Sequence, residues 1–204
     1  MGEPTDNAVQ VGCVGSIHYE VNVMGKAAHS ARPWHGENAL YKALPLINKI
    51  ASLDPKLQNI FGVDFYDVLS ITESQSSPGK TTVPDIWTGN LNYRFSPTHS
   101  LDDAINYVET IVKDIDSTYQ LTRLSAVNAG KVIEHPILES FKKTFKCEAK
   151  QAWTDVAQLT DLGICAFNFG PGHQAQAHRP DEYVYYDDMI KYEKQLHQGL
   201  LEES

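Results

Sequence analysis

A histidine in a glycine-rich loop is the residue of this sequence best placed to do chemistry. His178 lies in Phe169-Gly-Pro-Gly-His-Gln-Ala-Gln-Ala-His-Arg-Pro-Asp-Glu182, directly after the apolar run Ile164–Phe169. Loops of this kind, at the end of a buried strand, are where α/β proteins usually build their sites. Asp181 and Glu182 could orient the imidazole ring, as carboxylates behind metal-bound histidines do. A lone loop histidine is more often simple surface polarity, so the interpretation depends on other residues.

Three further residues have side chains suited to a site. Glu3 lies in the tight stretch Gly2-Glu-Pro-Thr5, and His29 lies among small residues in Gly25-Lys-Ala-Ala-His-Ser-Ala-Arg-Pro33. Arg94 projects from the polar side of an expected strand, and arginine is a natural bidentate clamp for a carboxylate. Each residue taken alone also fits an ordinary solvated surface.

The composition excludes some classes of partner. The hydrophobic content of 42% and the charged content of 21% are ordinary for a folded protein. A formal net charge of −9 argues against nucleic acid and anionic membranes as partners, because both require a basic face. No run reaches the length of a membrane span, and the N-terminal residues do not form the apolar h-region of a signal peptide. Three widely spaced cysteines fit free thiols in a reducing cytoplasm.

The elements expected to position these residues form a β-α-β-β-α-β series. Alternating apolar residues predict strands over 16–24, 65–71, 86–95 and 119–126. Helical spacing predicts helices over 38–51, with Pro45 inside it, and over 101–115, with a capping box formed by Ser100 and Asp103. This order is the ferredoxin-like split arrangement, and it occupies residues 15–127.

After residue 127, the sequence no longer follows this series of alternating strands and helices. We expect a helix starting at Pro136, a short helix over 156–162, a strand over 164–169 and a last helix capped by Asp187 or Asp188. This set is too small for an independent α/β domain. We therefore expect an α/β (α+β) chain in which residues 15–127 form an inserted domain, while 1–14 and 128–204 are parts of a second, incomplete domain.

Five sequence blocks together resemble the M20 metallopeptidase family, the di-metal amidohydrolases. They occur in family order over nearly the whole chain: Gly2-Glu-Pro-Thr5; Val23-Met-Gly-Lys-Ala-Ala-His-Ser-Ala-Arg-Pro33 with Gly36 and Asn38-Ala39; Val83-Pro-Asp85 with Asn92-Tyr-Arg94; Trp153-Thr-Asp155; and Gly170-Pro-Gly172 with Ala177-His178. The resemblance is greatest to the actinobacterial type of succinyl-diaminopimelate desuccinylase. It implies that residues 15–127 are the family's lid, or dimerisation, domain and the rest belongs to its zinc-peptidase-like catalytic domain.

The resemblance also implies a role for individual residues. Glu3 and His178 match metal ligands, one for each of two ions, and the ions would be Zn²⁺ or Co²⁺. His29 matches the lid histidine that reaches the partner's active site in a homodimer and stabilises the oxyanion. The remaining matches are substrate-binding positions: Arg94, Thr82, Thr154, Gly170 and Gly172. Thr82 replaces an Asn that is common in the family, which puts one dimer-crossing substrate contact in doubt.

The family's first catalytic half, with its HxDxxP-like and Glu-Glu motifs, has no counterpart here. We therefore expect a fragment that binds metal weakly or not at all and is inactive alone. The implied parent activity is hydrolysis of an N-acyl amino acid, N-succinyl-diaminopimelate in lysine biosynthesis. Two alternatives stay open: acetylornithine deacetylase or another aminoacylase, and a non-catalytic dimerisation fragment.

Overall fold

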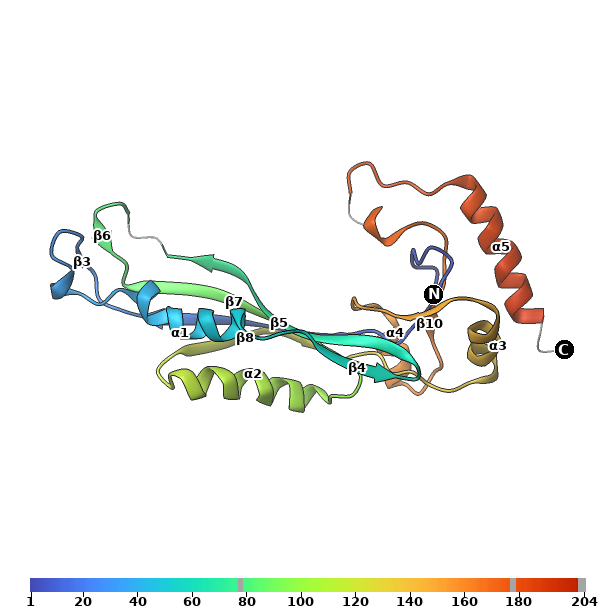
Figure 1. Ribbon diagram of the computed structural model, residues 1–204, viewed down its shortest axis with the longest axis horizontal. Coiled ribbons are helices and arrows are strands. Elements are labelled where there is room, and N and C mark those ends of the chain that lie inside the picture. The colour runs from blue at the N-terminus through green and yellow to red at the C-terminus, as the bar shows by residue number, and fades with distance from the viewer. Residues whose placement is uncertain (77–78, 177–178, 202–204) are drawn as a thin grey trace.

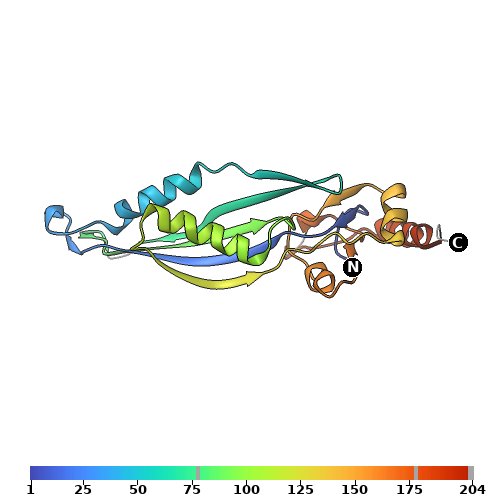
Figure 2. The same cartoon turned by 90° about the horizontal axis from the view of Figure 1, so that it is seen from below.

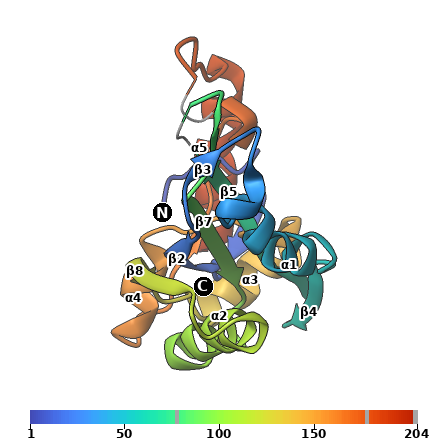
Figure 3. The same ribbon diagram turned by 90° about the vertical axis from the view of Figure 1, so that its left-hand side faces the viewer.

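The computed structural model describes residues 1–76, 79–176 and 179–201, and within them the chain is elongated (Figure 1). The larger part is a five-stranded antiparallel sheet in the order β4-β5-β7-β2-β8, with α1 and α2 on one face (Figure 3). Its elements are β2 (Gly15–Met24), α1 (Ala39–Ala51), β4 (Lys56–Ile60), β5 (Val63–Gln75), β7 (Ile86–Phe95), α2 (Leu101–Ile115) and β8 (Gln120–Val127).

Alternation along the strands builds the core of this part. Ile17, Tyr19, Val21 and Val23 of β2 are buried toward the helices, while the residues between them face the open side of the sheet. The helices close the core with small and branched residues, and they run side by side along the sheet (Figure 2). The ferredoxin-like arrangement predicted from the sequence is confirmed.

The two helices begin where their capping residues place them. The Asn38 side chain accepts hydrogen bonds from the backbone N–H groups of Leu40 and Tyr41 at the start of α1. Ser100 and Asp103 form the predicted capping box of α2. Pro45 lies inside α1 on its exposed side, and the helix continues through it to Ala51.

Strand β4 is the element of the large sheet that the sequence patterns did not predict. It pairs with β5 as a hairpin whose turn residues, Phe61 and Gly62, have φ angles of 52° and 79°. Two consecutive positive φ angles are typical of a type I′ turn, in which glycine is favoured. The expected strand over 65–71 is consequently the middle of a longer strand.

A smaller, three-stranded sheet lies at the other end of the elongated molecule, and its strands come from both sides of the large sheet in the sequence. Its central strand β1 (Val9–Val11) pairs parallel with β9 (Cys147–Ala149) and antiparallel with β10 (Phe167–Asn168). It is accompanied by α3 (Pro136–Thr144), α4 (Val156–Asp161) and α5 (Tyr186–Leu201). The expected strand over 164–169 is only two residues long, and Asp187 and Asp188 lie in the first turn of α5 rather than at its cap.

Side chains from the β4–β5 hairpin fix the two parts together. Val63 and Phe65 pack in the second hydrophobic cluster, beside Val9 and Leu138. Gln151 adds two hydrogen bonds, because its Oε1 accepts from the Tyr66 N–H at 3.0 Å and its Nε2 donates to the Tyr66 carbonyl at 2.6 Å. None of the helices within the described ranges has the length and hydrophobicity needed to cross a membrane.

Candidate functional site

The segment that carries Glu3 is bound to the glycine loop by backbone hydrogen bonds. The Phe169 N–H donates to the Met1 carbonyl at 2.9 Å, and the Gly170 carbonyl accepts from Asn7 N–H at 3.0 Å. The buried Thr5 hydroxyl oxygen accepts the Gly170 N–H at 3.1 Å. The structure therefore brings Glu3 together with Gly170 and Gly172, residues that lie more than 160 positions apart in the sequence.

Both glycines of this loop are required by local geometry. A Cβ atom at Gly170 would lie 2.4 Å from the backbone oxygen of Glu3, closer than any side chain can approach. Gly172 has a φ of +84°, in the left-handed region that favours glycine. The close contact at Gly170 holds the half-buried Glu3 against the loop.

The segment with Glu3 and the glycine loop enclose a cavity of about 280 Å³ that is lined by Gly2, Pro4, Gly172, His173 and Glu182, among others.

The described residues can be compared with what a metal site requires. A zinc site normally needs three or four protein ligands. Within the described ranges, no three His, Cys, Asp or Glu side chains come together to hold a metal ion. His178, the other predicted ligand, lies outside the described residues. The described side chains alone therefore do not fit a complete metal site.

Lys150, directly after β9, is a residue of this site that the sequence patterns did not indicate. It is buried, and its Nζ donates a hydrogen bond of 3.4 Å to Gln174 Oε1. Burial lowers the pKa of Lys150, and the Glu3 carboxylate acts in the opposite direction. Its surroundings depend on residues from both ends of the chain, so no local motif could have revealed it.

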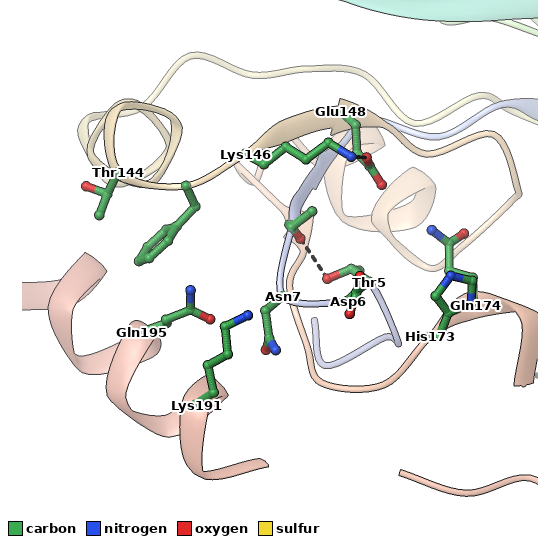
Figure 4. A pocket seen from close by; sticks show the side chains of 12 residues that line it. Thr5, Asp6, Asn7, Thr144, Lys146, Glu148, His173, Gln174, Lys191 and Gln195 are labelled. Atoms are coloured by element: carbon green, nitrogen blue, oxygen red, sulfur yellow. Dashed lines mark hydrogen bonds and ion pairs between the residues drawn. The ribbon is translucent and has the colours of Figure 1, made fainter. Parts of the chain in front are cut away.

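A second, larger cavity of about 480 Å³ lies on the other side of the N-terminal segment (Figure 4). Lys191 and Gln195 of α5 face Asn7 across it, and Lys146, just before β9, forms an ion pair of 2.8 Å with Glu148 of β9 at its rim. None of the predicted site residues that the structure describes lines this cavity.

Thr154 lies beside β10, the strand that leads into the glycine loop, but its side chain is not on an open surface. It is buried, and its hydroxyl oxygen accepts a hydrogen bond of 3.3 Å from Asn168 in β10. In the described chain this side chain joins α4 to the small sheet.

His29 and Thr82 lie at the opposite end of the long axis, in the short strands β3 (Ala28–His29) and β6 (Thr82–Val83) (Figure 1). The two residues are direct partners across this two-stranded ladder. His29 is exposed, and its Nδ1 accepts the Ala31 N–H at 3.1 Å. A neutral imidazole that accepts at Nδ1 carries its proton on Nε2, which is then available as a donor.

Arg94 lies between these two groups, on the open face of the large sheet. It pairs with Ser16 at the start of β2, so it is at the end of the sheet nearest β1. Its Nε donates to Asn92 Oδ1 at 3.1 Å, and burial lowers the pKa of the guanidinium. Within one chain, the structure groups Glu3 with Gly170 and Gly172, and it groups His29 with Thr82.

Comparison with known proteins identifies the family. The profile of the peptidase dimerisation domain matches residues 11–120. Succinyl-diaminopimelate desuccinylase of Corynebacterium glutamicum is 35% identical over 188 residues, which cover 89% of this chain and 51% of that protein. The chain belongs to the M20 peptidase family. A putative succinyl-diaminopimelate desuccinylase of Mycobacterium tuberculosis is 31% identical, over 90% of this chain and 52% of its own length.

Solved structures share the fold of this M20 chain. An aminopeptidase from Bacillus cereus superimposes with a TM-score of 0.73 at 14% identity, over 97% of this chain and 54% of its own. A tripeptidase from Staphylococcus aureus does so with a TM-score of 0.67 at 17% identity, over 98% and 54%. The chain thus spans about half the length of the curated relatives it matches. M20 proteins generally use a divalent metal ion.

Proposed function

We propose that this chain is part of an amidohydrolase that cleaves N-succinyl-diaminopimelate into succinate and diaminopimelate. The observation that carries the proposal is the 35% identity to the Corynebacterium desuccinylase over 89% of the chain. In this proposal residues 15–127 form the lid and dimerisation domain, and residues 1–14 and 128–204 contribute to the catalytic domain. The ions would be Zn²⁺ or Co²⁺, with Glu3 and His178 each supplying one ligand.

The proposed homodimer would bury the outer side of α1. Tyr41, Leu44 and Pro45 are exposed on this helix at helical spacing, whereas the exposed residues of α2 are polar. Among the described residues, an unpaired strand edge lies on the same side, because β4 covers β5 only up to Asp67. A second copy placed edge to edge along β5 would cover both surfaces and extend the sheet across a two-fold axis.

The position of His29 supports a site shared between two chains. His29 and Glu3 lie at opposite ends of the elongated chain, so one chain does not place both beside the same substrate (Figure 1). In the proposed dimer, His29 of one protomer donates from Nε2 to the oxyanion formed in its partner, while Arg94 binds a substrate carboxylate. One preorganised oxyanion donor typically lowers the barrier by a few kcal/mol.

Reconstitution tests the proposed reaction. The 204-residue chain alone should not hydrolyse N-succinyl-diaminopimelate, because the described residues do not form a complete metal site. Addition of the half of the Corynebacterium desuccinylase that this chain does not match should produce turnover, measured as succinate release. Hydrolysis of N-acetylornithine in preference to the succinyl substrate would favour the alternative deacetylase activity. Turnover of the succinyl substrate by the chain alone would contradict the fragment hypothesis.

A further inference from the structure

We infer that His18 is a positioning residue for Arg94 and acts through the side-chain amide of Asn92. This inference rests on the proposed function in one respect, namely that Arg94 binds a carboxylate of the substrate. The three residues lie on the open face of the large sheet, where His18 of β2 is the direct cross-strand partner of Asn92 of β7, and Ser16 is that of Arg94. Asn92 is buried, although it faces the side of the sheet without helices.

Two neighbours fix the orientation of the Asn92 amide independently. A guanidinium can only donate, so the oxygen of Asn92 must be the atom that faces Arg94 Nε at 3.1 Å. The backbone carbonyl of Ile17 can only accept, so the nitrogen must be the atom that lies 3.1 Å from it. The amide cannot be turned without losing both bonds and setting a donor against a donor.

This orientation in turn selects the state of His18. The fixed Asn92 nitrogen lies 3.0 Å from His18 Nε2, which must therefore accept and carry no proton. A neutral His18 then has its proton on Nδ1, which lies 3.3 Å from the side-chain nitrogen of Asn90, so that amide must be turned by 180° to accept the proton. The Asn90 amide can offer its oxygen there, because its other neighbour, the Thr72 hydroxyl, can donate as well as accept.

The result is a directed chain of hydrogen bonds that leaves one side of Arg94 free. His18 Nε2 accepts a hydrogen bond from the Asn92 nitrogen, and the Asn92 oxygen accepts one from Arg94 Nε. Within the described residues, the two terminal nitrogens of Arg94 make no hydrogen bond, so they present the paired donors that a carboxylate accepts. The chain of bonds thus orients the guanidinium before a ligand arrives, which reduces the entropy that binding must overcome.

Nuclear magnetic resonance on the intact 204-residue chain at pH 8 tests the positioning role. We expect His18 to be the Nδ1–H tautomer, and Arg94 Nε–H to exchange slowly with water. His18→Leu should speed that exchange, whereas His18→Gln, which keeps an acceptor, should retain slow exchange. Thr88→Val is the matched control, because it breaks a polar pair with Asn22 farther along the same two strands. An Nε2–H tautomer, or unchanged exchange in His18→Leu, would overturn the inference.

Titration with succinate separates this inference from the proposed function. Arg94→Gln should abolish binding, and His18→Leu should weaken it about tenfold, the effect of losing one hydrogen bond that orients a charged group. His18→Gln should restore most of the affinity. If the wild-type chain and Arg94→Gln give the same titration curve, the carboxylate role of Arg94 fails, while the tautomer and exchange measurements still decide the role of His18.

Discussion

At the scale of single residues, burial changes the acid–base chemistry of the large core. Tyr19 is only 2% exposed, and its hydroxyl donates to Glu109 Oε1 at 2.7 Å. Burial, with a smaller contribution from the Glu109 carboxylate, raises the pKa of Tyr19 to about 12. The unfolded chain loses this proton near the ordinary value of 10.0. Stability from Tyr19 is therefore complete below pH 10 and is lost as the pH rises toward 12.

Tyr19→Phe should reduce this loss of stability in alkali. The variant should be about 0.5–1.5 kcal/mol less stable at pH 8, because it lacks the hydrogen bond to Glu109. Its free energy of unfolding in urea should then fall less steeply from pH 9.5 to 11.5 than that of the wild-type chain. Tyr186→Phe, at a residue that is 74% exposed, is the control and should keep the wild-type slope. Equal slopes for Tyr19→Phe and wild type would show that Tyr19 titrates as in the unfolded chain.

The surroundings of Glu3 allow a prediction about how tightly the chain binds a metal ion. A single half-buried carboxylate, with no described cluster of three ligands around it, should hold Zn²⁺ only weakly. After dialysis, metal analysis of the purified chain should find well under one tightly held ion per chain. Glu3→Gln should lower the remaining affinity, and Glu37→Gln on the exposed lid surface should not. Two ions retained per chain would show that the chain supplies a full set of ligands.

At the scale of elements, α1 and α2 differ in what they leave exposed. Both bury apolar residues against the same sheet, but α1 leaves Tyr41 and Leu44 exposed at 67% and 42%. Strand β8, at the opposite edge, also exposes an apolar residue, Leu124, at 58%. The edge of the sheet beside α1 and the edge formed by β8 are therefore both candidates for contact with a second copy of the chain. Matched substitutions on the two edges can distinguish them.

Leu44→Asp should convert the proposed dimer into a monomer, because it would place a charge in the interface between two copies of α1. Leu124→Asp should leave the dimer intact, since β8 lies at the other edge of the sheet. Light scattering at tens of micromolar measures both. A monomeric wild-type chain would remove the dimer from the proposed function, and dissociation by Leu124→Asp alone would move the interface to β8.

The sequence predicted those elements whose signal is local. The alternation in β2 and the capping box at Ser100 each lie within one short stretch, and both are found as predicted. Strands β1, β9 and β4 were missed because they are short, and β1 and β9 are stabilised by pairing between distant segments. The contact between Glu3 and Gly170, the pairing of His29 with Thr82 and the burial of Lys150 depend on tertiary structure in the same way.

At the scale of the whole molecule, the long axis separates the groups that the proposed reaction must bring together. His29 is at one end and the segment with Glu3 is at the other (Figure 1). An active site assembled from two chains needs His29 from one protomer and Glu3 from its partner. Each protomer in such a dimer supplies half of each of two equivalent sites.

Subunit mixing in the reconstituted enzyme tests this claim most directly. His29→Ala should lower kcat by about 10²–10³-fold with less effect on KM, as loss of one oxyanion donor does, and Glu3→Ala should be similarly inactive. When the two variants are mixed and re-equilibrated, half of the dimers should contain one intact site, so activity should recover to about a quarter of the wild-type value. A normal kcat for His29→Ala, or no recovery on mixing two variants that both dimerise, would contradict a site shared between chains.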